Sequence, residues 1–262
     1  MTKLNQSIQR AMSLLTILAK ESPIGLTRLS RRSGLHKSTV HRVLQTLLAE
    51  GWVYRRQGDG LFQVSVDMPL LKQTMTPQQH VAERVSNTLK LLQQQTDDWP
   101  LVVSMLDGVR MQVVETSGSS QRLKLYDDVM EFRPHILWSA MGRAYLSFCP
   151  EQERQNIFKQ LQLSKDKYDQ ITHNQHLIDR IITETKQRGY GTRDPRYTER
   201  MMNYDYQLSA IAVPVLAPDR VLATITLMWI AGEATEQQMV KDYLKPIKEA
   251  SKCISDRLLT YE

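Results

Sequence analysis

Residues 26–65 read LTRLSRRSGLHKSTVHRVLQTLLAEGWVYRRQGDGLFQVS, and the spacing of apolar and glycine residues in this segment predicts its local structure. Residues 26–32 have the length of a short helix, and Gly34 follows as an end signal, because glycine takes the left-handed conformation of a helix C-terminus without steric cost. In residues 36–48, apolar side chains recur at the spacing of one buried helix face. The segment therefore predicts two helices joined by a tight turn.

A β-hairpin is predicted directly after the second helix. Gly51 ends that helix, and residues 52–56 and 61–65 are rich in β-branched and aromatic side chains on either side of a glycine-flanked turn. Upstream, apolar residues recur at helical spacing over residues 6–20, which predicts a first helix of about four turns. Three helices followed by a hairpin, the predicted wing, indicate a winged helix-turn-helix.

The polar face of residues 36–48 gathers short and basic side chains in its first two turns. Lysine and arginine contact phosphates, and serine and threonine let a helix approach base edges in the major groove. This face carries no acidic residue before Glu50, which favours a recognition helix over the alternative, an ordinary solvated surface. The expected DNA-binding residues of the module are Arg10, Thr27, Arg28, His36, Lys37, Ser38, Thr39, His41, Arg42, Arg55 and Arg56.

Charge is unevenly distributed along the chain. Residues 1–72 hold eleven lysines and arginines against four acidic residues, a formal charge of +7. The whole 262-residue chain carries +6, so residues 73–262 carry −1. A basic module on a near-neutral body is typical of a polyanion binder, because neutralised phosphates release counterions. Charge alone does not separate DNA from RNA or from an anionic lipid surface.

Composition and motifs disfavour several classes of protein. Two distant cysteines, Cys149 and Cys253, build neither a disulfide framework nor a zinc site. Without a secretion signal, and with no apolar run near the ~18 residues of a membrane span, the protein is expected in the cytoplasm with no membrane partner. There is no Gly-x-Ser-x-Gly elbow, phosphate-binding glycine loop or Cys-x-x-Cys, and His173 and His176 lack further metal ligands. We expect no catalytic residues, no metal and no cofactor.

The rest of the chain alternates between helices and strands. Thr76 as an N-cap and Pro77 at the first helical position predict a helix that ends near Gln95. Beyond it, a hairpin is expected at 101–106 and 111–115, helices at 139–148, 151–163, 175–188 and 235–259, and inner strands at 209–216 and 221–230. The predicted fold class is α+β, divided into a DNA-binding winged helix-turn-helix (1–72), a linker helix (73–98) and an α/β domain (99–262).

The segment GLHKSTVHRVL at 34–44 resembles the helix-turn-helix core of the IclR family of transcriptional regulators, and the resemblance extends over residues 5–66. One departure is His36, where members of the family often carry proline. The motifs SAMGRAYL at 139–146, RGYG at 188–191 and AIAVPV at 210–215 follow in the order of the family's effector-binding domain. That domain is a relative of GAF sensor domains, and the resemblance implies a curved antiparallel sheet that encloses a small-molecule pocket together with helices. AYLSFCPEQER at 144–154 is most similar to regulators of aromatic-acid breakdown, such as those of phenylpropionate catabolism.

This resemblance implies a ligand-responsive bacterial regulator of a catabolic operon that senses a small, aromatic carboxylic acid. Its partners would be double-stranded operator DNA, the effector and, as a further candidate, RNA polymerase, and its assembly a homodimer or a dimer of dimers. The effector would lie near a helix N-terminus, which favours a carboxylate. The effector-binding residues implied are Leu137, Ala140, Met141, Gly142, Asp194, Ala210, Ala212, Thr224 and Thr226. For each of them core packing is the alternative, and for Asp194 a loop ion pair.

Two other functions stay open on the residues alone. An effector-independent architectural DNA-binding protein would bind many sequences equally, and no ligand would stabilise its larger domain. An enzyme with a DNA-tethering domain would turn over a small acid. The charge distribution and the wing fit all three hypotheses, and the family resemblance favours the regulator.

Overall fold

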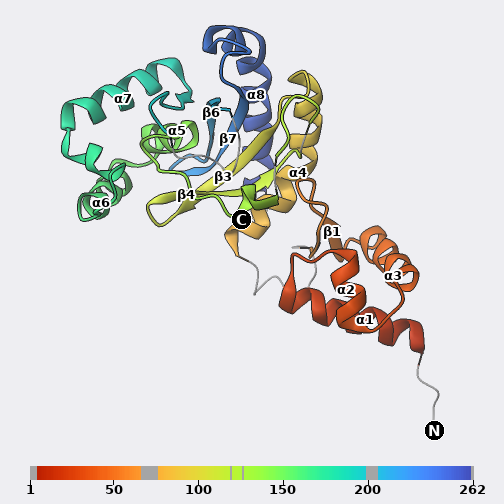
Figure 1. Cartoon of the computed structure of the whole chain (residues 1–262). Helices are drawn as coiled ribbons and strands as arrows, with labels where there is room; N and C mark the ends of the chain where they lie inside the picture. Colours follow the sequence, from red (N-terminus) through yellow and green to blue (C-terminus); the bar gives the residue numbers. More distant parts are fainter. Residues whose placement is uncertain (1–4, 66–75, 119, 126, 199–205, 261–262) are drawn as a thin grey trace. The chain divides into compact units, whose positions relative to one another are not determined.

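The computed structural model describes residues 5–65, 76–118, 120–125, 127–198 and 206–260 (Figure 1). The chain divides into two compact units, residues 1–83 and 84–262, and the division falls within α4 (Pro77–Gln95). The predicted boundary between residues 72 and 73 lies outside the described residues. No helix in the described ranges combines the length and the apolar character that a membrane crossing requires.

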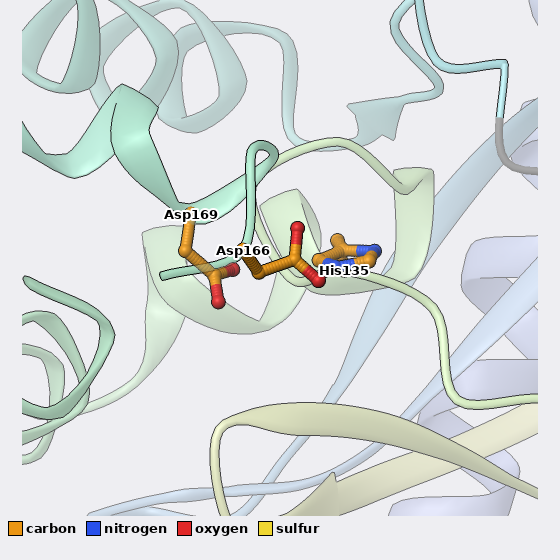
Figure 2. A group of neighbouring side chains, drawn as sticks. All are labelled: His135, Asp166 and Asp169. Carbon is orange, nitrogen blue, oxygen red and sulfur yellow. Dashed lines mark hydrogen bonds and ion pairs between the residues drawn. The ribbon is translucent and has the colours of Figure 1, made fainter. Parts of the chain in front are cut away.

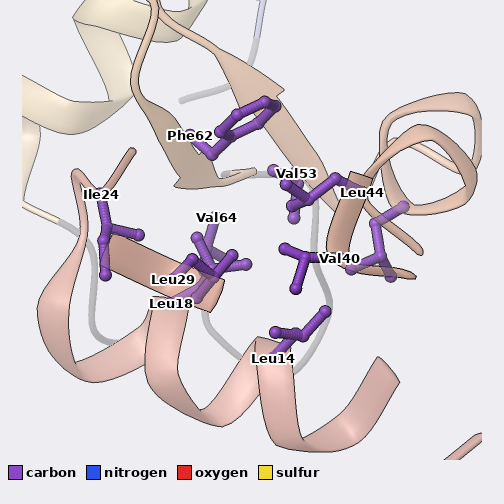
Figure 3. Packing of buried hydrophobic residues seen from close by; sticks show 10 residues of the cluster. Leu14, Leu18, Ile24, Leu29, Val40, Leu44, Val53, Phe62 and Val64 are labelled. Carbon is purple, nitrogen blue, oxygen red and sulfur yellow. The ribbon is translucent and has the colours of Figure 1, made fainter. Parts of the chain in front are cut away.

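The first unit has the predicted order of three helices and a hairpin. Its elements are α1 (Gln6–Glu21), α2 (Leu26–Ser33), α3 (Lys37–Ala49), β1 (Val53–Arg55) and β2 (Phe62–Val64). The two strands, which with their turn form the wing, are antiparallel, and Ile24 before α2 adds one bridge to Phe62. Every element contributes to one apolar core (Figure 3), whose buried side chains include Leu14, Leu18, Ile24, Leu29, Val40, Leu44, Val53, Phe62 and Val64. Burial of each such side chain stabilises the unit by about 1.5–3 kcal/mol relative to exposure.

Local signals set the helix ends in this unit. Gly34 ends α2 with φ +70°, the left-handed conformation predicted for it. His36 is the N-cap of α3, because its Nδ1 accepts a hydrogen bond from the Ser38 N–H at 3.4 Å. The helix therefore begins at Lys37, and the histidine that stands at the family's proline position caps the helix instead of opening it.

The second unit is built on a five-stranded sheet in the order β4-β3-β7-β6-β5, in which all neighbouring strands are antiparallel. Its strands are β3 (Leu101–Asp107), β4 (Arg110–Thr116), β5 (Gly191–Thr192), β6 (Leu208–Leu216) and β7 (Val221–Ile230). Its other helices are α5 (Ala140–Phe148), α6 (Glu151–Gln162), α7 (Gln175–Arg188) and α8 (Glu236–Leu259), with short 3-10 turns η1 (Asp127–Met130) and η2 (Asp169–His173).

The helices cover both faces of this sheet (Figure 1). α5 packs on one face of β6 and β7, with α6 and α7 beyond it. α8 packs on the other face, where the Ser251 hydroxyl donates to the Pro214 carbonyl at 2.6 Å. Arg257 of α8 also donates to the Thr88 hydroxyl at 2.9 Å, which joins α8 to α4. The central strands are therefore buried on both sides.

Most predicted elements of the second unit appear within two residues of their expected bounds. Thr76 caps α4 as predicted, since its hydroxyl accepts from the Gln79 N–H at 3.3 Å and its own N–H donates to the Gln79 side chain at 2.8 Å. Ser139 is the N-cap of α5 and not its first residue. The sequence prediction missed β5 because two residues carry no periodic signal.

Candidate DNA-binding surface and effector cavity

The first candidate site is the exposed face of α3. Val40 and Leu44 anchor the helix in the core, and on the opposite face Lys37, Ser38, His41 and Arg42 are exposed, whereas Thr39 is half-buried. Sequence reasoning missed Gln45, which is exposed on this face one turn after His41, with 3.5 Å between its Nε2 and the Nε2 of His41. Its i+4 spacing from His41 was the available signal. Glutamine can bind adenine through two hydrogen bonds, so this face can read bases as well as phosphates.

Residues before α3 add basic side chains to this site, but part of their positive charge is already neutralised. Thr27 and Arg28 are exposed on α2, and Arg10 is half-buried on α1. Glu21 neutralises part of the positive charge of α2. Arg32 Nε donates to its carboxylate at 2.7 Å, and Arg28 Nη2 lies 3.5 Å from the same carboxylate. The hydrogen bond from Arg32 lowers the pKa of Glu21, which therefore stays ionised. The net basic surface of α2 is accordingly smaller than a count of arginines indicates.

The two arginines of the wing differ, and the structure corrects the prediction for one of them. Arg55 is exposed, and its Nε donates to the Gly60 carbonyl at 2.9 Å, so it remains a candidate phosphate contact. Arg56 is only 8% exposed, and its guanidinium lies 3.3 Å from Asp59. Successive side chains of a strand point to opposite faces, so the two cannot both point outward. Arg56 holds the turn and does not present its charge to DNA.

The second candidate site is the sheet face covered by α5. Ala212 lies opposite Thr226 in the β6–β7 ladder, and Ala210 lies opposite Met228. Directly opposed residues of antiparallel strands share a face, so these small side chains form one surface. The Ser104 hydroxyl of β3, 3.1 Å from the Met141 sulfur, shows that this surface faces α5.

A small cavity lies between this surface and the start of α5. Its lining residues are Phe132, Pro134, Ser139, Ala140, Met141, Arg193, Leu208, Ala210, Thr226 and Met228. Four of the nine predicted effector residues are among them, whereas Leu137, Gly142, Asp194, Ala212 and Thr224 are not. The cavity has a volume of about 20 Å³, which is room for about one water molecule. An effector would therefore have to displace side chains such as Met141 and Met228.

Gly142 has a packing role that differs from the one expected. A Cβ at this position would lie 2.0 Å from the carbonyl oxygen of Ile136 and 2.4 Å from its Cα. The space beside this glycine is therefore filled by backbone and does not admit a ligand. On the other side of the helix, a Cβ on Gly191 would lie 2.3 Å from the Ala140 carbonyl oxygen. Two glycines thus let neighbouring backbone clamp the first half of α5.

Asp194 is part of a buried ion pair and does not line the cavity. Its carboxylate lies 2.6 Å from Arg143 and 3.0 Å from Arg196, and the side chain of Arg143 also donates to the Leu137 carbonyl at 2.8 Å. Burial alone would raise the pKa of Asp194, but hydrogen bonds from Arg196 and Arg143 outweigh it and hold the pKa well below its usual range. The ion pair that was the alternative for Asp194 is therefore present, and it fixes α5 to the segment after β5.

A further cluster joins His135, Asp166 and Asp169 near the start of η2 (Figure 2). His135 Nε2 lies 3.0 Å from Asp166. The guanidinium of Arg110 donates to both oxygens of Asp169 at 2.8 Å and lies 3.7 Å from Asp166. Arg110 thus already supplies the positive charge that a metal ion would bring to these carboxylates. We interpret the cluster as an ion-pair network that ties the hairpin of β3 and β4 to η2.

Comparison with known proteins matches both units to one family. The model of the IclR helix-turn-helix domain matches residues 7–57, and that of the bacterial transcriptional regulator IclR C-terminal domain matches residues 73–256. The HTH-type transcriptional regulator KipR of Bacillus subtilis is 25% identical over 256 residues, which cover 97% of each chain. These families and relatives are transcriptional regulators, not enzymes.

Solved structures agree on the fold. The Thermotoga maritima IclR has a TM-score of 0.55 at 16% identity and covers 96% of this chain and 98% of its own. An IclR homologue of Microbacterium hydrocarbonoxydans, solved with 4-hydroxybenzoate, has a TM-score of 0.51 at 17% identity over 97% and 100% of the two chains. The α3 surface, the sheet covered by α5 and the two family models lead to one conclusion: this chain belongs to the IclR family of DNA-binding transcriptional regulators.

Proposed function

We propose that this regulator binds operator DNA through α3 and the wing, and that its DNA affinity changes when a small carboxylic acid occupies the cavity between α5 and the sheet. In this scheme residues 1–72 bind DNA, residues 73–98 link the domains and residues 99–262 bind the effector. A homodimer or a dimer of dimers acts on a two-fold operator in the cytoplasm, with RNA polymerase as a candidate partner, because paired modules double the contact with DNA.

The observation that carries the effector site is the hydroxyl of Thr226. Thr226 is fully buried, lines the cavity and has no hydrogen-bond partner for its hydroxyl among the described residues. Leaving such a group unsatisfied costs about 1–3 kcal/mol, so an unsatisfied buried group requires a functional or structural reason. A polar atom of a bound molecule would remove this cost. The rest of the lining is mainly apolar, as in most small-molecule sites.

Three features support an aromatic acid as the effector, and with it control of a catabolic operon. Phe132, Met141 and Met228 give the cavity aromatic and flexible apolar walls that can pack on a ring. The Microbacterium hydrocarbonoxydans homologue was solved with 4-hydroxybenzoate, an acid of this kind. The segment at 144–154 also resembles regulators of aromatic-acid breakdown.

Thermal unfolding of the full-length protein with a panel of acids tests this proposal. The panel contains 4-hydroxybenzoate, 3-(4-hydroxyphenyl)propanoate, 3-phenylpropanoate, benzoate, succinate and pyruvate. A ligand at one hundred times its Kd adds about 2.7 kcal/mol to the stability of the domain that binds it. We expect an aromatic member to raise Tm. If no acid raises Tm, an effector-independent architectural DNA-binding protein becomes the better account. The small volume of the cavity already favours that alternative.

A further inference from the structure

The outermost stripe of α3 runs opposite its buried side. An α-helix has about 3.6 residues per turn, so residues at i, i+4 and i+7 lie along one face. Val40 and Leu44 are buried in the core, and the opposite face carries Ser38, Arg42 and Gln45, which are all exposed. From Ser38 to Gln45 this stripe extends roughly 10 Å along the helix axis, which is about three base-pair steps of DNA.

The hydroxyl groups on and beside this stripe are already bonded within α3 and its cap. Ser38 Oγ lies 2.8 Å from Nδ1 of the N-cap His36. The Thr46 hydroxyl donates to the Arg42 carbonyl at 3.3 Å. The side chains of Arg42 and Gln45 therefore remain as the long polar groups of the stripe that can extend into a groove of DNA.

Arg42 and Gln45 offer different hydrogen-bonding groups, so they suit different bases. A guanidinium only donates, which matches the two acceptors O6 and N7 of guanine. A glutamine amide both donates and accepts, which matches N7 and the N6 amino group of adenine. The two residues are three apart in the helix, so their positions differ by roughly 4.5 Å along its axis, close to one base-pair step. The two side chains can therefore bind bases of neighbouring pairs.

His41 holds the amide of Gln45 in one orientation. The Nε2 atoms of the two side chains lie 3.5 Å apart. An amide nitrogen only donates, so the imidazole Nε2 is the acceptor of this hydrogen bond. The second amide N–H and Oε1 of Gln45 remain for a base, and they form the donor and acceptor pair that adenine requires. Restricting the side chain in advance also reduces the entropy that binding would cost.

We propose that Gln45 selects an A·T base pair in each operator half-site by binding its adenine, and that Arg42 binds a guanine of the neighbouring pair. His41 is a positioning residue for the Gln45 amide. This inference rests on the proposed function, since it concerns the same α3 surface. It adds a base specificity that the charge of the module cannot supply, because phosphate contacts carry no sequence information.

The test is selection of duplexes from a random library by the full-length protein, without ligand and with the acid panel. Every single base-pair change of the selected duplex is then titrated by fluorescence anisotropy. The variants are Gln45→Ala, Gln45→Glu, His41→Ala and Arg42→Ala. The matched control is Gln160→Glu, which makes the same chemical change at an exposed glutamine on α6 of the second unit. Tm confirms that each variant is folded.

We expect the wild type to lose at least about fivefold in affinity when the A·T pair is changed, as one good bidentate contact requires. Gln45→Ala should abolish this preference at that pair alone and leave the salt dependence of binding unchanged, because it removes no charge. Gln45→Glu should prefer cytosine in place of the adenine, since a carboxylate accepts from the cytosine amino group. His41→Ala should weaken the preference for A·T without altering the neighbouring position, and Gln160→Glu should change neither.

Three results would overturn the inference. If Gln45→Ala keeps the wild-type preference at every base pair, Gln45 binds no base, and the proposed function stands because the wild type still selects an operator. The same holds if the positions altered by Gln45→Ala and Arg42→Ala are not neighbours. If the wild type selects no common sequence under either condition, the inference and the operator binding of the proposed function fail together. If the added charge of Gln45→Glu abolishes binding, Gln45→Ala alone decides.

Discussion

Replacement of Gly142 by alanine should destabilise the second unit, although alanine is the better helix former. In an exposed helix interior the change would gain about 1 kcal/mol. Here the added Cβ would lie 2.0 Å from the Ile136 carbonyl oxygen, and the three nearest atoms all belong to the Ile136 backbone. Overpacking of this kind costs about 1–3 kcal/mol or more, and the upper end applies because backbone must move. The net expectation is a loss of about 2 kcal/mol.

Urea unfolding of the full-length protein, followed by circular dichroism, measures this loss. Gly108→Ala is the control, since Gly108 has φ +60° and a Cβ added there would meet nothing within 4 Å, so only backbone strain of about 1 kcal/mol applies. Because two units can unfold in two transitions, the loss should appear in one transition and leave the other in place. A Gly142→Ala protein as stable as the wild type would refute the backbone clamp on α5.

Three further predictions concern DNA, the buried ion pair and the cavity. Arg42→Ala should weaken binding to operator DNA more than binding to an unrelated duplex. Arg55→Ala should weaken binding to both duplexes alike and reduce the dependence of the affinity on salt concentration. An equal loss for both duplexes with Arg42→Ala would contradict the placement of the recognition helix. Because the pKa of Asp194 is lowered, its stabilisation is present above the unfolded pKa near 3.9 and is lost as pH falls through the folded pKa. Asp194→Asn should therefore cost about 3 kcal/mol at pH 7 in urea unfolding, with a smaller difference from wild type below about pH 4; a pH-independent difference would count against the ion pair. Thr226→Val should leave the free energy of unfolding unchanged or raise it by about 1 kcal/mol, because the hydroxyl it removes has no partner among the described residues. Thr224→Val should lower the free energy of unfolding, because the Thr224 hydroxyl donates to the Ser104 carbonyl at 3.5 Å. A loss of stability for Thr226→Val would mean that its hydroxyl has a partner in the free protein.

The sequence was informative wherever a local, repeating signal existed. The apolar spacing of residues 36–48 and the glycine at position 34 predicted α3 and the turn before it, because both depend on neighbours in the chain. The same holds for Thr76 as the N-cap of α4, whereas its partner Gln79 is seen only in the structure. Helix periodicity and capping are local properties, so one sequence is enough to find them.

The residues that sequence reasoning placed wrongly depend on packing contacts that helix and strand periodicity does not specify. Arg56 points inward because neighbouring side chains alternate between the two faces and Arg55 points outward. Its guanidinium then pairs with Asp59 in the turn. Gly142 faces backbone because the segment containing Ile136 folds back against α5. Nothing in the local pattern distinguishes these cases from an exposed wing arginine or a pocket glycine.

In the effector cavity, too, some residues could be predicted from the sequence and others could not. The strand positions Ala210 and Thr226 followed from resemblance and were brought together by register. Arg193 lines the cavity, its backbone N–H donates to the Ala210 carbonyl and its guanidinium lies over the ring of Tyr197, and no spacing rule predicts these contacts. Asp194, the next residue in the sequence, instead forms an ion pair with Arg143, which is fifty-one residues away in sequence.

The measurement that most directly tests the account is the affinity of the full-length protein for DNA with and without an acid that raises its Tm. A duplex selected by the protein from a random library and a shuffled duplex of the same composition would be titrated by fluorescence anisotropy at fixed salt. The account predicts that the saturating acid changes Kd for the selected duplex at least about fivefold, as a coupling of 1 kcal/mol or more requires, and leaves the shuffled duplex unchanged. Equal affinity for both duplexes, or a Kd for the selected duplex that the bound acid does not alter, would contradict it.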